Sequence, residues 1–138
     1  MGIKMSTATV TIAWAEVTMQ APPSSFRSVP SRDIDGCADM RNWLIEHGDR
    51  DGVYVPVTVM PAYSSLSKTR HGFHFVTYLS DFTYDKNMLK STSVKDAWSN
   101  AFIGIVEDLM YMLDEDTATI YFHDHIKTSA VFLAKEEQ

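Results

Sequence analysis

The densest group of hydroxyl and positively charged side chains on any expected loop of this sequence lies at residues 63–70. It comprises Tyr63, Ser64, Ser65, Lys68 and Arg70. Hydroxyl groups donate and accept hydrogen bonds, whereas Lys and Arg only donate, so together these residues could orient a small polar ligand. A hydrophilic hairpin tip has the same composition. The pattern therefore leaves two interpretations open, a ligand site and a plain turn.

The histidines raise the question of a metal site. His71 and His74 are three residues apart, and His123 and His125 flank Asp124. Each pair could supply two ligands, but neither repeats a known ligand frame. We therefore expect surface or hydrogen-bonded histidines and no bound metal.

Two other kinds of chemistry lack their usual sequence support. The six glycines are isolated, so there is no glycine-rich phosphate loop and no Gly-x-Ser-x-Gly nucleophile elbow. Cys37, the only cysteine, falls in the apolar row of a predicted helix, which favours an inert buried thiol over a nucleophile. The acidic cluster near residues 107–116 is interpreted as a solvated helix face.

Composition and charge predict one cytoplasmic domain. The 138 residues, 45% of them hydrophobic, can bury one core, so we expect a single domain over residues 1–138 with a flexible tail at 135–138. The formal net charge is −6 and the basic residues are scattered, so no nucleic-acid partner is expected. No apolar run approaches the ~20 residues that cross a bilayer, and residues 1–8 are too short and polar for a signal peptide. A lone cysteine fits a reducing compartment.

Hydrophobic periodicity predicts two helices, over residues 33–47 and 93–113. The second is expected to be capped by Ser93, with Asp96 three residues on. Its apolar residues recur at helical spacing over five turns, which makes it the best-determined element of the chain.

Alternating patterns predict five strands, over residues 7–19, 53–60, 73–79, 117–123 and 128–134. In the first, Val10, Ile12 and Trp14 share one face and Ala13 lies on the other. Pro56 makes the second an edge or bulged strand, because proline cannot donate to a ladder. The order βαββαβ with an additional C-terminal strand predicts an α+β, ferredoxin-like fold.

Several segments, read in order, resemble the phage S-adenosylmethionine (SAM) lyases, formerly called SAM hydrolases. The similarity begins at Ser25-Phe26-Arg27-Ser28, continues at Gly52-Val53-Tyr54 and Tyr63, and is strongest at Thr119-Ile120-Tyr121 and at residues 127–135. It also includes the helix that contains Met40 and Leu44. These segments together span most of the chain.

The resemblance implies a homotrimer of ferredoxin-like, PII-like subunits that binds SAM between neighbours and needs no cofactor. The products would be methylthioadenosine and homoserine lactone, and loss of the methyl donor in the host cytoplasm would counter methylation and restriction. Tyr63 matches the family's catalytic tyrosine. The family's catalytic glutamate has no match, because no Glu occurs between Glu46 and Glu107. The remaining candidates, all for substrate binding, are Phe26, Arg27, Tyr54, Ser64, Ser65, Arg70 and His74.

Two other functions fit the same sequence. The first is a non-catalytic oligomer, a sponge or PII-like regulator, that holds an adenosine-containing metabolite. The unmatched glutamate favours this alternative, whereas the chain-wide similarity favours the lyase. The second is a protein-binding inhibitor that uses the acidic surface.

Overall fold

The computed structural model describes residues 13–21, 36–50, 52–63, 66, 70–89 and 92–136. The expected start of the first strand, the first residues of the predicted helix at 33–47, and the candidates Phe26, Arg27, Ser64 and Ser65 lie outside the described residues. Arg70 is described by its backbone alone.

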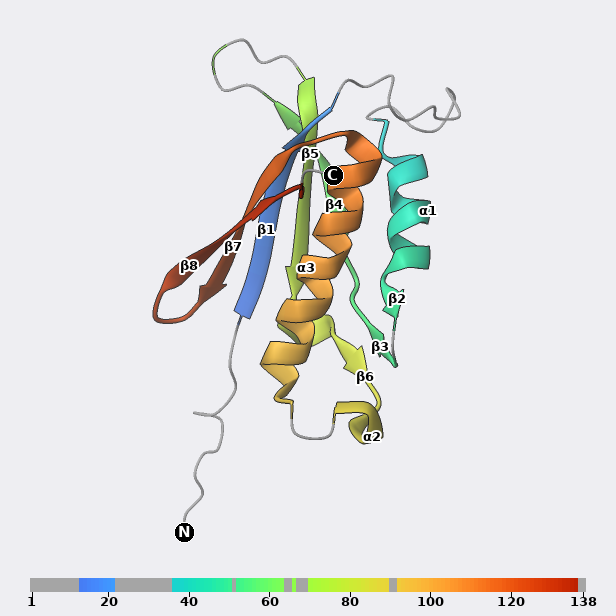
Figure 1. Ribbon diagram of the computed structural model, residues 1–138, viewed down its shortest axis with the longest axis vertical. Helices are drawn as coiled ribbons and strands as arrows, with labels where there is room; N and C mark the ends of the chain where they lie inside the picture. Colours follow the sequence, from blue (N-terminus) through green and yellow to red (C-terminus); the bar gives the residue numbers. More distant parts are fainter. Residues whose placement is uncertain are drawn as a thin grey trace.

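The protein has an α+β fold built on a five-stranded antiparallel sheet (Figure 1). The strands are β1 (Ala13–Gln20), β4 (Thr58–Tyr63), β5 (Arg70–Tyr78), β7 (Thr117–Asp124) and β8 (Thr128–Ala134), in the order β4-β5-β1-β7-β8. The helices α1 (Ala38–His47) and α3 (Val94–Leu113) pack on one face of this sheet and form a single hydrophobic core with it. No helix in the described part of the chain is long and apolar enough to cross a membrane.

Helix α3 forms as its sequence predicts. The Ser93 hydroxyl accepts a hydrogen bond from the Asp96 amide at 3.1 Å and caps the first turn. One stripe is buried against the sheet, and the helix ends where Asp114 adopts a left-handed conformation with φ of 56°. Its buried residues are Trp98, Phe102, Ile105, Val106, Leu109, Met110 and Leu113.

Helix α1 begins later than predicted, at Ala38 instead of residue 33. Gly36 has φ of 75°, which a right-handed helix does not allow, so the helix starts only after it. Met40 and Leu44 are buried, and Cys37 at the N-cap is buried as well.

The predicted strand at 53–60 is interrupted at Pro56 and forms two strands instead of one. The first part, β3 (Val53–Tyr54), joins a separate three-stranded sheet with β2 (Asp49–Arg50) and β6 (Thr83–Tyr84). The second part is β4, which lies at an edge of the five-stranded sheet, as the proline predicted. The expected loop at 80–90 contains β6, a 3₁₀ turn (Leu79–Asp81) and the short helix α2 (Lys86–Leu89).

Strand β1 sends alternate side chains to the two faces of the sheet. Ala13, Ala15, Val17 and Met19 are buried beneath the helices. Trp14, grouped in the sequence with Val10 and Ile12, lies on the other face together with Glu16, Thr18 and Gln20. We call this side the open face. By strand register it also carries the exposed side chains of Met60, Tyr78, Tyr121 and Phe132.

Candidate functional site

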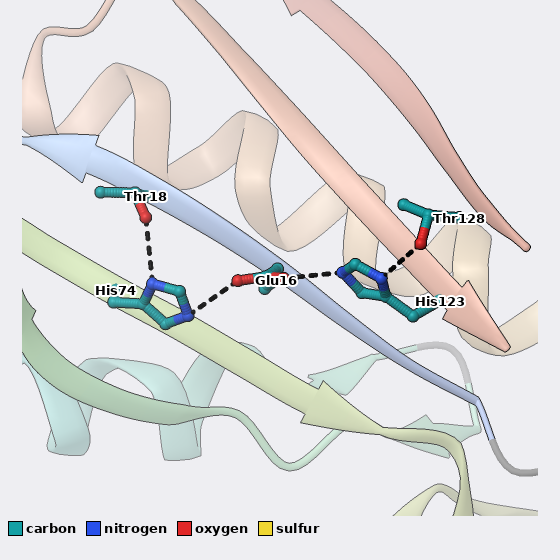
Figure 2. Close-up of polar contacts among 5 residues, drawn as sticks. All are labelled: Glu16, Thr18, His74, His123 and Thr128. Atoms are coloured by element: carbon teal, nitrogen blue, oxygen red, sulfur yellow. Dashed lines mark hydrogen bonds and ion pairs between the residues drawn. The ribbon is translucent and has the colours of Figure 1, made fainter. Parts of the chain in front are cut away.

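A carboxylate flanked by two imidazoles lies at the centre of the open face (Figure 2). Glu16 Oε1 is 3.2 Å from Nε2 of His74, and Glu16 Oε2 is 2.6 Å from Nε2 of His123. The three side chains come from β1, β5 and β7, which are neighbours in the sheet. Thr18 pairs with His74 and Trp14 with His123, so both histidines lie diagonally across from Glu16 and can reach it.

Two threonine hydroxyls contact the Nδ1 atoms of these rings. Thr18 Oγ1 lies 3.0 Å from Nδ1 of His74, and Thr128 Oγ1 lies 2.8 Å from Nδ1 of His123. An ionised carboxylate only accepts hydrogen bonds, so each Nε2 must donate to Glu16. In a neutral ring Nδ1 then accepts from the threonine hydroxyl, and the chain of bonds fixes both the tautomer and the ring orientation.

The Glu16 carboxylate is held in place but still has capacity to accept further hydrogen bonds. A carboxylate offers about four lone-pair positions, and the two histidines occupy two of them. The Glu16 side chain keeps 25% of its surface exposed. A negative charge that is fixed in place, partly desolvated and still open on one side is suited to contacting a cationic group of a ligand.

A groove of about 710 Å³ extends from Glu16 along the open face between β1 and β7. The two strands pair only from Ala13 to Glu16, although both continue beyond that pairing, and the groove lies where the ladder has stopped. Its lining includes two carboxylates, Glu16 and Glu115, and neither Lys nor Arg among the described residues. The charge of the groove therefore favours cationic ligands over phosphates.

A second hollow, of about 420 Å³, is lined by residues of β4 and β5 and by Thr18 of β1. It is lined by Thr18, His74, Met60 and Tyr63, among others. Thr18 lines both cavities, whereas Glu16 lines the groove and His74 the hollow. Thr18 therefore separates the two cavities, and the Glu16–His74 pair lies beside it, since the Thr18 hydroxyl contacts Nδ1 of His74.

The structure brings two of the residues singled out from the sequence into this hollow, Tyr63 and His74. The Tyr63 side chain is 57% exposed. Arg70 is paired with Tyr63 in the sheet register, although its side chain lies outside the described part. Tyr54 is elsewhere, on β3 of the three-stranded sheet, and lines neither cavity.

The histidines do not form a metal centre within the described residues. There, no group of three or more His, Cys, Asp or Glu side chains is arranged to hold a metal ion. His123 is bound to Glu16, and Asp124, its neighbour in sequence, accepts hydrogen bonds from the amides of Ile126 and Lys127 in the β7–β8 turn.

Sequence reasoning missed Glu16 and the role of His123. The resemblance places the family's glutamate between Glu46 and Glu107, whereas Glu16 lies well before this stretch. One signal was present, because Glu16 is the single charged residue of the alternating segment at 7–19. A charge at such a position is typical of a functional side chain or of one satisfied by neighbouring strands.

The comparisons with known proteins reveal a distant structural relationship. No protein-family model matches the chain, and no curated protein matches it. Among solved structures, a phage SAM lyase in its apo state matches the chain with a TM-score of 0.51 at 10% sequence identity. The match covers 100% of this chain and 99% of that chain. At this identity the likeness establishes a similar fold and nothing finer.

Proposed function

We propose that the protein binds SAM on the open face and cleaves it to methylthioadenosine and homoserine lactone. The observation that carries the proposal is the Glu16 carboxylate, which lines the groove and contacts His74 of the neighbouring hollow. It supplies a fixed negative charge in a chain whose fold resembles that of a phage SAM lyase over its whole length.

The charge of the site fits this substrate. SAM carries a sulfonium and an ammonium against one carboxylate, so it is a net cation at neutral pH. The groove presents Glu16 and Glu115 with neither Lys nor Arg among its described lining. A nucleotide phosphate would need the cationic donors that such a lining lacks, which favours SAM over a phosphorylated signal.

The reaction needs little acid–base machinery. A carboxylate oxygen of the substrate attacks its own γ-carbon, the bond from that carbon to sulfur breaks, and sulfur keeps the electron pair. The products are neutral methylthioadenosine and homoserine lactone, whose amine remains protonated. The protein chiefly has to fold the methionine arm into the attack geometry, which can lower the barrier substantially without a cofactor.

Tyr63 is the residue proposed to orient the reacting arm. It lines the smaller hollow together with His74, whose imidazole is bound to Glu16. A phenolic hydroxyl can donate to the substrate carboxylate or accept from the ammonium. This position supports a role beside the amino-acid head of the substrate.

The assembly and cellular role are proposed with it. The order β4-β5-β1-β7, with both helices on one face, supports a ferredoxin-like subunit. Exposed Met60, Tyr78, Tyr121 and Phe132 on the open face support a homo-oligomer, which we propose is a trimer. Acting in a host cytoplasm during phage infection, the protein would deprive methyltransferases of their donor. Light scattering that finds a monomer at micromolar concentration would contradict the trimer.

The test is incubation of the protein with SAM and a chelator, followed by chromatography. Methylthioadenosine should accumulate, and Tyr63→Phe should slow its formation at least about tenfold if the hydroxyl contributes about 1.4 kcal/mol in the transition state. The matched control is Tyr111→Phe, since Tyr111 is 59% exposed on α3 and belongs to neither cavity. Binding without product would support the non-catalytic metabolite-binding oligomer instead. If the protein neither binds nor cleaves SAM, both functions are refuted.

A further inference from the structure

We infer that Glu16 receives the sulfonium of the substrate, with the adenosine in the β1–β7 groove and the amino-acid arm in the Tyr63 hollow. This inference rests on the proposed function and adds the orientation of the ligand and the part of it that Glu16 contacts.

The first argument is the geometry of the two cavities. Glu16 lines the groove, its partner His74 lines the hollow, and Thr18 lines both. A ligand that fills both cavities therefore passes over Thr18 with its middle, beside the Glu16–His74 pair. In SAM the middle is the sulfonium, with adenosine on one side and the amino-acid arm on the other.

The second argument is size and polarity. The groove, at about 710 Å³, is larger than the hollow, at about 420 Å³, and adenosine is the bulkier half of the ligand. Tyr121, which lines the groove, is 45% exposed and offers an aromatic surface for a base. Tyr63 in the hollow offers a hydroxyl for the polar amino-acid head.

The third argument is the chemistry of a sulfonium. It carries a positive charge but no N–H or O–H donor, so it makes no strong hydrogen bond and is recognised mainly by a nearby negative charge or an aromatic face. Glu16 meets this requirement. Its carboxylate is held from two sides by His74 and His123 at 3.2 and 2.6 Å, so it cannot turn away to pair elsewhere.

This placement has a kinetic consequence. The positive charge on sulfur disappears as the carbon–sulfur bond breaks, so Glu16 stabilises the bound substrate at least as much as the transition state. An interaction of this kind lowers KM without raising kcat. The neutral product methylthioadenosine would then lose its attraction to Glu16, which assists its release.

The experiment compares SAM with S-adenosylhomocysteine, a neutral thioether with the same adenosine and the same amino-acid arm. The wild-type protein should bind S-adenosylhomocysteine about tenfold more weakly than SAM. Glu16→Gln should raise KM for SAM about tenfold, leave kcat within about threefold, and leave the Kd of S-adenosylhomocysteine within about twofold. The control is Glu46→Gln, the same charge change at an exposed position on α1, which should alter none of these values.

Three results would overturn the inference. Equal wild-type affinity for the two ligands would do so without any variant, and this comparison decides the matter even if Glu16→Gln does not fold. A Glu16→Gln protein whose kcat falls at unchanged KM would also overturn the inference. The same holds for a Glu16→Gln protein whose affinity falls equally for both ligands. In each of these cases methylthioadenosine would still form from SAM in the wild-type protein, and only the role of Glu16 would fall. A wild-type protein that neither binds nor cleaves SAM would refute the proposed function itself.

Discussion

The indole of Trp14 stacks on the imidazole of His123, with ring centroids 4.1 Å apart and planes inclined by 20°. The two residues are direct cross-strand partners in the β1–β7 pairing. Glu16 and Thr128 contact the two nitrogens of the same ring, and Trp14 covers one of its faces. These three contacts together hold the His123 ring in place. Trp14 therefore helps to position the Glu16 carboxylate, because it holds the His123 ring that contacts this carboxylate.

Replacing Trp14 by Leu should release the His123 ring and loosen Glu16. A stacked aromatic pair contributes about 0.5–1.5 kcal/mol, so we expect KM for SAM to rise about threefold to tenfold while kcat changes little. The control is Trp43→Leu, because Trp43 stacks on His47 at 3.7 Å in helix α1, away from the open face. Steady-state kinetics with both variants test this, and an equal effect of the two on KM would contradict it.

Thr77 is the one buried polar residue in the described core. Its hydroxyl connects helix α3 to the segment between β3 and β4. It donates to the Pro56 carbonyl at 2.9 Å and accepts from Trp98 Nε1 at 3.3 Å. Thr77→Val keeps the shape but leaves both partners unsatisfied, so the free energy of unfolding should fall by about 2–4 kcal/mol. Thr58→Val, at an exposed position on β4, should change it by less than about 0.5 kcal/mol. Urea unfolding of the two variants tests the difference, and equal losses would show that these hydrogen bonds contribute little.

The parts of the fold that depend on local pattern could be predicted from the sequence. Helix α3 has helical spacing and the Ser93 cap, and both act within one segment. Pro56 indicated an edge or bulged strand, and the structure shows an edge strand, β4, that begins only after the proline. Helix α1 was predicted with its end correct and its start too early, because the periodicity at 34–37 does not reveal the positive φ of Gly36.

The candidate site could be predicted only in part, because it depends on strand order and register. Glu16, His74 and His123 are separated by 58 and then 49 residues, and they meet only because β5 and β7 pair on either side of β1. Spacing within one segment contains no such information. Tyr63 was a candidate through the resemblance and the hydroxyl-rich segment, and neither of these could predict that it lines one hollow with His74.

Gly72 is required by a close approach between β5 and β1. A Cβ at this position would lie 2.0 Å from the Met19 carbonyl oxygen and 2.8 Å from the Gln20 Cα, both backbone atoms. Gly72→Ala should therefore push the strands apart and lower the free energy of unfolding by about 1–3 kcal/mol. His74 is two residues away on the same strand, so the geometry of its pairing with Glu16 should change as well.

Gly104→Ala makes an informative contrast to Gly72→Ala. Its Cβ would meet only the end of the flexible Arg50 side chain, which can move at the expense of its exposed pairing with Asp108. Alanine in a helix is favoured over glycine by about 1 kcal/mol, so we expect a neutral or stabilising change. Thermal and urea unfolding of the two variants should separate them, and a destabilisation of Gly104→Ala as large as that of Gly72→Ala would contradict the packing argument.

Asp124 should make the protein lose stability in acid. Backbone amides of Lys127 and Ile126, and to a smaller extent the Lys95 ammonium, lower the pKa of its carboxyl from 3.8 to about 2. Because the folded-state pKa lies below the unfolded one, ionised Asp124 favours the folded state above about pH 4, and this contribution is lost as the pH falls toward 2. Asp124→Asn does not titrate, so the difference in unfolding free energy between wild type and variant should shrink between pH 4 and pH 2. Lys95→Met should keep most of the wild-type pH dependence, since the two amide bonds dominate. Urea unfolding at pH 4, 3 and 2 measures this, and parallel curves for wild type and Asp124→Asn would show that the turn does not hold the carboxylate as described.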